Sequence, residues 1–198
     1  MKHFLLAFTF VAVGATAASA QLDATVNLTG ISARNPQVAA EYAVSDKFGV
    51  ELGVGVALGS ESYEIFAGDL SDRYEWNRGG LLATLQGKLY FSPDEATEGL
   101  YAAAYARYRN VSLKNETLNG EAVEGADDLA INRLALGAAL GYKAVFKRFV
   151  FETAGGAGFA PVSDNEYLSR FDGGAGFFDS LDNLDLYFRA SIGFRIIE

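Results

Sequence analysis

The chain has 198 residues, with 25 Asp and Glu against 16 Lys and Arg, a formal net charge of −9, no cysteine and one histidine. This acidity disfavours nucleic acid as a partner, and the absence of cysteine excludes disulfides and thiolate metal sites. The length suits a single domain.

The first twenty residues have the pattern of a secretory signal peptide. Lys2 and His3 give a positive start, residues 4–13 are mostly apolar, and Ala18-Ser19-Ala20 fits an A-x-A cleavage site. The apolar core is too short to cross a membrane as a helix. We therefore expect residues 1–20 to be removed on export and residues 21–198 to form the functional domain.

Alternation of large apolar residues with small or polar ones predicts β-strands through the rest of the chain. The clearest stretch is residues 48–59, where apolar side chains recur at every second position from Phe48 to Leu58. Strands of soluble domains usually have about five or six residues, so this longer strand suits a membrane barrel. The pattern predicts eight strands, at residues 22–29, 37–44, 48–59, 81–91, 99–111, 133–143, 149–159 and 184–196.

The segments between these strands are short and long mostly in alternation. Short connections are expected at residues 32–36, 45–47, 92–97 and 147–148, and long, mostly acidic loops at residues 60–79, 112–128 and 161–183. Transmembrane barrels have an even number of strands, with short turns at one end and longer loops at the other. The sequence therefore predicts an all-β fold, an eight-stranded antiparallel up-and-down transmembrane β-barrel.

Alternation alone does not decide which face of the wall points outward. In a soluble lipocalin-like barrel the apolar face lines a ligand cavity, whereas in a membrane barrel it meets lipid. The predicted polar faces are rich in Gly, Ala and Thr and carry little charge for a water-facing surface. Aromatic residues also gather near expected strand ends, as interfacial girdles do: Tyr42, Phe91, Tyr108, Tyr142, Phe146 and Phe149. Both observations favour the membrane arrangement.

With its signal peptide, strand rhythm, loop asymmetry and terminal strand, the chain resembles the small eight-stranded outer-membrane barrels of Gram-negative bacteria. These are the OmpA/OmpX-like and opacity-protein group, and the resemblance covers residues 21–198. It implies an outer-membrane location, contact with lipid and insertion by the barrel-assembly machinery. That machinery reads a terminal aromatic residue in the family, whereas this chain ends Phe194-Arg195-Ile196-Ile197-Glu198. We expect a monomer whose loops 60–79, 112–128 and 161–183 are available to an extracellular partner.

The sequence offers no set of catalytic residues. Without a histidine after residue 20, Ser–His–Asp and Cys–His catalysis and the common zinc sites are excluded. The resemblance points the same way, because the enzymatic barrels of this kind (deacylases, palmitoyl transferases and omptin proteases) use a histidine. Asp127-Asp128 and the Asp179/Asp182 pair could bind a hard cation, but a solvated acidic loop is the simpler interpretation. We expect no enzyme activity, no cofactor and no metal site.

Ten charged residues fall on the predicted polar faces. They could form a selectivity filter in a narrow solute or ion pore, but we favour a structural ion-pair network. An eight-stranded barrel has a lumen that side chains fill, and buried charges are tolerated there only when they pair. The residues are Glu41, Glu51, Lys88, Arg107, Arg109, Arg133, Lys143, Glu152, Arg189 and Arg195.

The short turns predict two neighbour pairs within this set. A three-residue turn at 45–47 would pair Val44 with Phe48 and place Glu41 opposite Glu51, whereas a two-residue turn at 147–148 would place Lys143 opposite Glu152. Two facing carboxylates repel and lose hydration when buried. We expect a cation between Glu41 and Glu51, with three candidates: Lys88, Arg189 and Arg195.

Overall fold

The computed structural model describes residues 21–67, 70–91, 97–124, 128–165 and 183–197, which are almost entirely antiparallel β-structure. The expected signal peptide lies outside these residues. The elements are β1 (Leu22–Asn27), α2 (Leu28–Ser32), β2 (Gln37–Ser45), β3 (Phe48–Ala57), β4 (Ser60–Ala67), β5 (Leu70–Tyr90), β6 (Gly99–Leu118), β7 (Glu121–Ala122), β8 (Leu129–Phe146), β9 (Phe149–Asn165) and β10 (Leu184–Ile197).

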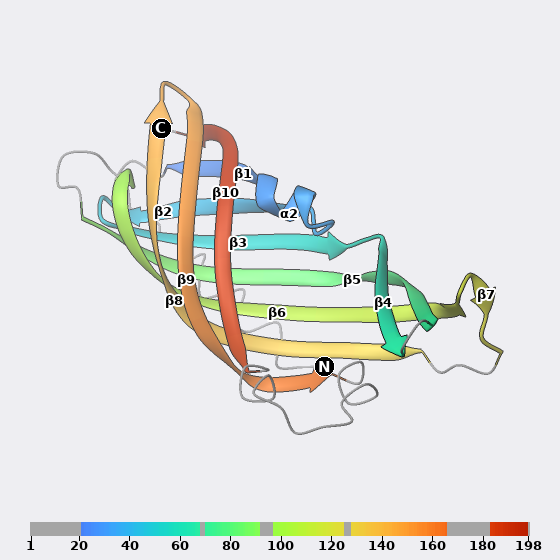
Figure 1. The fold of residues 1–198 in the computed structure, drawn as a ribbon. Helices are drawn as coiled ribbons and strands as arrows, with labels where there is room; N and C mark the ends of the chain where they lie inside the picture. The colour runs from blue at the N-terminus through green and yellow to red at the C-terminus, as the bar shows by residue number, and fades with distance from the viewer. Residues whose placement is uncertain (1–20, 68–69, 92–96, 125–127, 166–182, 198) are drawn as a thin grey trace, which may run out of the picture.

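Eight of the strands close into a barrel, which confirms the predicted fold class. The sheet order is β5-β3-β2-β1-β10-β9-β8-β6, and pairing of β6 with β5 closes the ring, with β4 and β7 attached at its edge. In Figure 1, β8, β9 and β10 bend across the layer formed by β1, β2, β3, β5 and β6. Because closure pairs every wall strand on both sides, the backbone groups of the wall need no water.

The two ends of the barrel differ in their connections. At what we call the turn end, Asp46-Lys47 joins β2 to β3 and Lys147-Arg148 joins β8 to β9, and Leu22 pairs with Ile197 nearby. The Lys147-Arg148 turn is as expected. The first turn is not, because Ser45 rather than Val44 pairs with Phe48 and a bulge follows Ala43. The opposite end, beyond which β4 and β7 lie, is the loop end.

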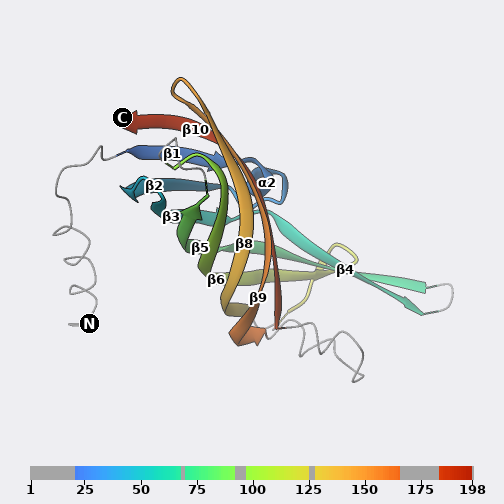
Figure 2. The same cartoon turned by 90° about the vertical axis from the view of Figure 1, so that its left-hand side faces the viewer.

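Strands at the loop end extend well past the predicted boundaries. The segment 60–79, expected as a loop, forms β4 and the start of β5, and Figure 2 shows this hairpin projecting beyond the wall. Likewise β6 continues to Leu118. In these polar extensions, hydrogen bonds between the paired strands satisfy the backbone N–H and C=O groups, and no apolar face is needed. Alternation in hydropathy therefore does not predict them. Of the predicted loop 161–183, residues 166–182 lie outside the described part of the chain.

Two further predictions about strand ends are wrong for local reasons. Leu28 is not in the first strand, because the Asn27 side chain accepts a hydrogen bond from the Gly30 amide (3.0 Å) and caps the short helix α2. Pro161 does not end a strand but lies within β9, where pairing with β8 is irregular between Leu134 and Leu136. A bulge tolerates the missing proline N–H.

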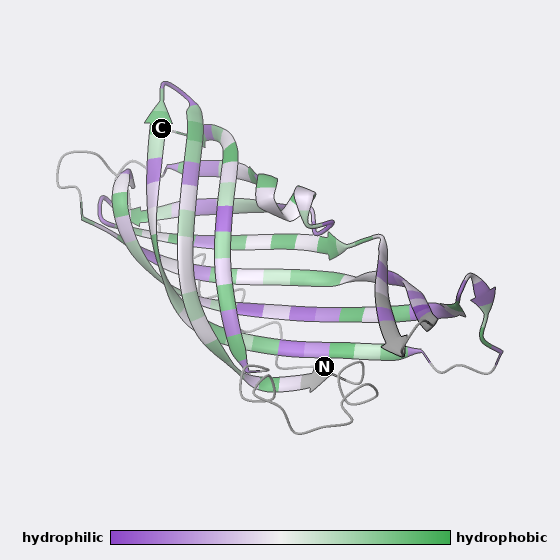
Figure 3. Ribbon diagram, in the orientation of Figure 1, coloured by the Kyte–Doolittle hydropathy of each residue, from purple (hydrophilic) through white to green (hydrophobic). Residues whose placement is uncertain are grey.

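Hydrophobic and hydrophilic residues alternate along the strands of the wall (Figure 3), and the exposed fractions show that the apolar side chains point outward and the polar ones inward. Val54 is 51% exposed and Leu136 50%, whereas Glu51 is 1% exposed and Lys88 is fully buried. This is the arrangement of a transmembrane barrel and the reverse of a lipocalin's. Tyr108 also faces outward, but it pairs with Ala83 and Leu134 in mid-strand rather than near a strand end. No described helix is long and apolar enough to span a membrane.

Candidate functional site

The barrel interior holds a group of buried charges that we call the central cluster: Glu41, Glu51, Lys88, Glu152 and Arg189. They come from β2, β3, β5, β9 and β10, and all face inward. Glu41 and Glu51 are directly opposite each other in the register, as the sequence predicted. Two carboxylates are therefore placed side by side by the strand pairing itself.

Lys88 stands among the three carboxylates of the central cluster. Its Nζ lies 2.7 Å from Glu41 Oε2, 2.8 Å from Glu51 Oε2 and 2.8 Å from Glu152 Oε1. An ammonium group has three N–H donors, so each carboxylate receives one. The cation expected between Glu41 and Glu51 is thus Lys88.

Arg189 is the second cation of the central cluster. Its guanidinium binds Glu51 through both terminal nitrogens, with Nη2 2.7 Å from Oε2, and Nη2 also lies 2.6 Å from Glu152 Oε1. Two tyrosines complete the shell: Tyr90 donates to Glu41 Oε1 (2.7 Å) and Tyr101 donates to Glu152. Neither tyrosine was among the predicted site residues, although alternation places Tyr101 on the same face as Arg107 and Arg109.

A second group of charges, the turn-end cluster, consists of Asp23, Glu98, Lys143 and Arg195. Lys143 Nζ is 2.8 Å from Asp23 Oδ2 and 3.0 Å from Glu41 Oε1, which links the two clusters. Arg195 binds Asp23 through Nε (2.9 Å) and Glu98 through Nη1 (2.9 Å). Lys143 is opposite Glu152 in the register, as expected, but its ammonium pairs elsewhere. Arg195 does not reach between Glu41 and Glu51.

The remaining predicted residues lie towards the loop end, apart from these clusters. Arg107 forms an ion pair with Asp185, whose Oδ2 also accepts a hydrogen bond from Tyr105 (2.9 Å). Arg133 donates to the Leu184 carbonyl (2.7 Å). Arg109 makes no hydrogen bond or ion pair with another residue that the structure describes. Sequence reasoning missed Asp23 and Asp185, although alternation with the apolar residues on either side puts both on polar faces.

The three glutamates of the central cluster are close enough to hold a metal ion, since one carboxylate oxygen from each lies within 4.8 Å of the others. Lys88 already occupies that position, however. The buried acids Asp23, Glu41, Glu51 and Glu152 are also matched by four bases that contact them: Lys88, Lys143, Arg189 and Arg195. Glu98 is the further acid of the turn-end cluster, and it shares Arg195 with Asp23. Of the loop aspartates considered as alternative cation ligands, Asp128 pairs with Lys114 (2.9 Å), while Asp127, Asp179 and Asp182 lie outside the described residues.

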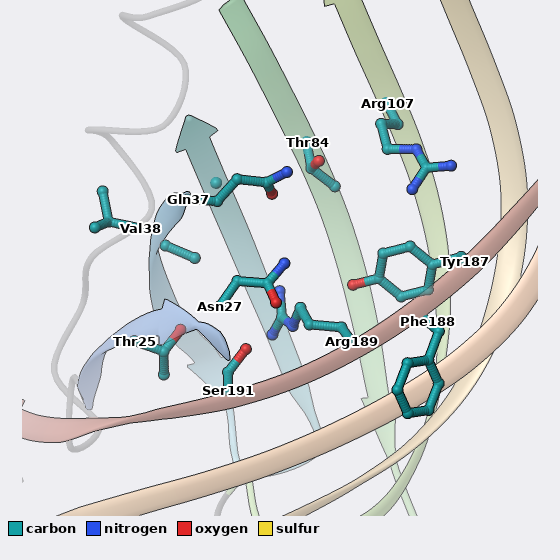
Figure 4. A pocket seen from close by; sticks show the side chains of 12 residues that line it. Thr25, Asn27, Gln37, Val38, Thr84, Arg107, Tyr187, Phe188, Arg189 and Ser191 are labelled. Atoms are coloured by element: carbon teal, nitrogen blue, oxygen red, sulfur yellow. The ribbon is translucent and has the colours of Figure 1, made fainter. Parts of the chain in front are cut away.

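Little open space remains on the loop-end side of the central cluster. A chamber of about 30 Å³ lies there, and Figure 4 shows Asn27, Gln37, Arg107 and Arg189 around it. That volume holds about two water molecules. Glycines in the wall make room for bulky interior side chains: a Cβ at Gly137 or Gly141 would collide with the ring of Tyr105 or Tyr101, respectively. The lumen at this level is packed with side chains.

Comparison with known proteins supports the fold alone. No family model matches the chain, and no curated protein matches its sequence. The crystal structure of CarO from Acinetobacter baumannii is 15% identical, covers 90% of this chain and 98% of its own, and superimposes with a TM-score of 0.51. That of Acinetobacter baumannii CarO2 is 16% identical, with coverages of 91% and 100% and a TM-score of 0.49.

Proposed function

We propose that this chain is a non-enzymatic outer-membrane β-barrel of the OmpA/OmpX-like and opacity-protein kind. It acts as a structural membrane element, a monomer whose acidic loop-end segments contact an extracellular partner. The observation that carries this proposal is the orientation of the wall, with an apolar outer face around a charged interior.

The outer face is incompatible with exposure to water. Large apolar residues such as Leu52, Leu85, Phe151 and Phe188 are 47–69% exposed and recur on all sides of the ring. Soluble monomers rarely expose continuous apolar surfaces of more than a few hundred Å², whereas hydrocarbon accepts such a wall. The signal-peptide pattern of residues 1–20 supports export, after which the barrel-assembly machinery would insert the chain.

The interior supports a structural role rather than catalysis or transport. Lys88 is fully buried and its three donors are all engaged, while Tyr90 and Tyr101 hold the carboxylates from the other side. Groups bound to one another in this way are not available to a substrate. The packing also argues against the alternative of a solute or ion pore, because the central cluster fills the lumen where ions would have to pass.

Membrane fractionation tests the proposal. We expect the protein in the outer-membrane fraction, with faster migration on gels before boiling than after it, as stable barrels show. A detergent-free soluble pool would contradict the proposed location. In planar bilayers, the purified protein should give no stable openings of nanosiemens size, and reproducible openings would favour the pore.

A further inference from the structure

The loop end of the lumen has a charge arrangement unlike that of the central cluster. Arg109 on β6 and Arg133 on β8 are directly opposite each other in the register. Both lie on the inward-facing positions of their strands and both are half-buried. Like charges placed directly opposite each other on a sheet repel, so a negative group between or beside the two guanidinium ions would stabilise this pair.

The described part of the chain does not provide that group. Asp185 on β10 faces the same part of the lumen, but it is engaged by Arg107 and Tyr105. Neither Arg109 nor Arg133 forms an ion pair with a described carboxylate. Moreover, the buried Nε atoms of Arg107 and Arg133 have no hydrogen-bond partner among the described residues. Within the described ranges, donors and positive charge therefore remain unmatched at this level.

The central cluster contains the opposite arrangement, in which two facing side chains are both negatively charged. There, Glu41 and Glu51 are also directly opposite, and Lys88 supplies the counter-charge with bonds to both. For Arg109 and Arg133 the equivalent position would be taken by an anion. The contrast is informative because the two pairs are both cross-strand neighbours on the inner face of one wall.

We propose that Arg109 and Arg133 form a binding site for a small oxyanion, a phosphate or a carboxylate, at the loop end of the lumen. The planar guanidinium group presents paired donors that match the oxygens of these anions. Arg107 lies at the neighbouring inward-facing position of β6, but its charge is paired with Asp185, so Arg109 and Arg133 carry the positive charge that no described carboxylate pairs with. Because the three side chains face the lumen, the anion is a soluble one that enters from the loop end, rather than a lipid headgroup in the surrounding bilayer.

Inorganic phosphate is the probe for this site, with the full-length folded protein in detergent micelles, so the test does not depend on the proposed location. Isothermal titration calorimetry should show saturable binding to the wild type. Arg109→Gln and Arg133→Gln should each weaken it at least tenfold. Arg73→Gln is the control, because Arg73 is exposed and already pairs with Glu75 at the loop end, and it should leave the affinity unchanged.

A second measurement separates loss of the site from loss of the fold. Gel migration before and after boiling verifies that each variant is folded, and phosphate should raise the unfolding temperature of the wild type more than that of the Arg109→Gln/Arg133→Gln double variant. No saturable binding to the wild type would overturn the proposal. So would equal binding to the double variant, or a chloride titration that matches phosphate, because each indicates non-specific screening of charge.

Discussion

Glu41 and Glu51 face each other across β2 and β3, and the ammonium of Lys88 lies 2.7 Å from one carboxylate and 2.8 Å from the other. The register creates a repulsion that a third strand, β5, relieves. Because all three side chains are buried, the stability of the barrel depends on keeping this group complete: a buried charge that loses its partner is strongly destabilising.

Lys88→Met should therefore lower the free energy of unfolding by about 3–5 kcal/mol. The double variant Lys88→Met/Glu51→Gln should lose less than Lys88→Met alone, since it also removes one of the carboxylates left unpaired. Urea unfolding in lipid vesicles measures both values, and a double-mutant cycle gives the coupling.

Lys114→Met is the control for that experiment. Lys114 also pairs with a carboxylate, at 2.9 Å from Asp128, but both side chains are more than half exposed. Loss of this exposed ion pair should change the free energy of unfolding by no more than about 1 kcal/mol. Strict additivity of Lys88→Met and Glu51→Gln would show that the central cluster is not energetically coupled.

Gly141→Ala should destabilise the barrel by about 1–3 kcal/mol through overpacking. A Cβ at this position would meet the ring of Tyr101 and lie 2.8 Å from the Thr153 carbonyl oxygen. Displacing Tyr101 would also disturb its hydrogen bond to Glu152. Gly79→Ala is the matched control, since a Cβ there meets nothing within 4 Å. The same urea titration compares the two, and equal effects would contradict the packing argument.

Val54→Arg should lower the free energy of unfolding in vesicles by about 2–4 kcal/mol, if this outward-facing position lies near the bilayer midplane. Glu121→Arg, on the exposed strand β7, should stay within about 0.5 kcal/mol. A spin label at Val54 gives a direct reading, because lipid-soluble quenchers should reach it and water-soluble ones should not. The opposite accessibility would place this face away from lipid.

Trypsin added to intact cells should cleave first at the loop end. Arg73 and Lys114 lie there with side chains that are 54% and 57% exposed, whereas Lys47 and Lys147 lie in the turns at the opposite end. Exposed segments beyond the wall are the preferred cleavage sites. Permeabilised cells serve as the control, in which the turns become accessible. Cleavage of intact cells only at the turns would mean that the barrel is inserted in the opposite direction.

The sequence by itself was sufficient to predict which residues of the wall share a face and which ones are neighbours across adjacent strands. A side-chain period of two determines which residues share a face, and turn length determines which residues of neighbouring strands meet. These two rules placed Glu41 opposite Glu51 and Lys143 opposite Glu152, although the first register is kept only because the bulge after Ala43 offsets a turn one residue shorter than predicted. The same period of two puts Asp23, Tyr101 and Asp185 on polar faces, but we did not recognise them as site residues from the sequence.

Only the tertiary structure decided which charges meet across the lumen. Lys143 reaches Asp23 on a strand 120 residues away rather than its neighbour Glu152, and Arg189 rather than Arg195 joins Glu51. Such contacts depend on the tilt and stagger with which the barrel closes, and alternation along a single strand carries no information about either. The polar hairpin of β4 and β5 was missed for a related reason: its stability comes from backbone pairing, which leaves no hydropathy pattern in the sequence.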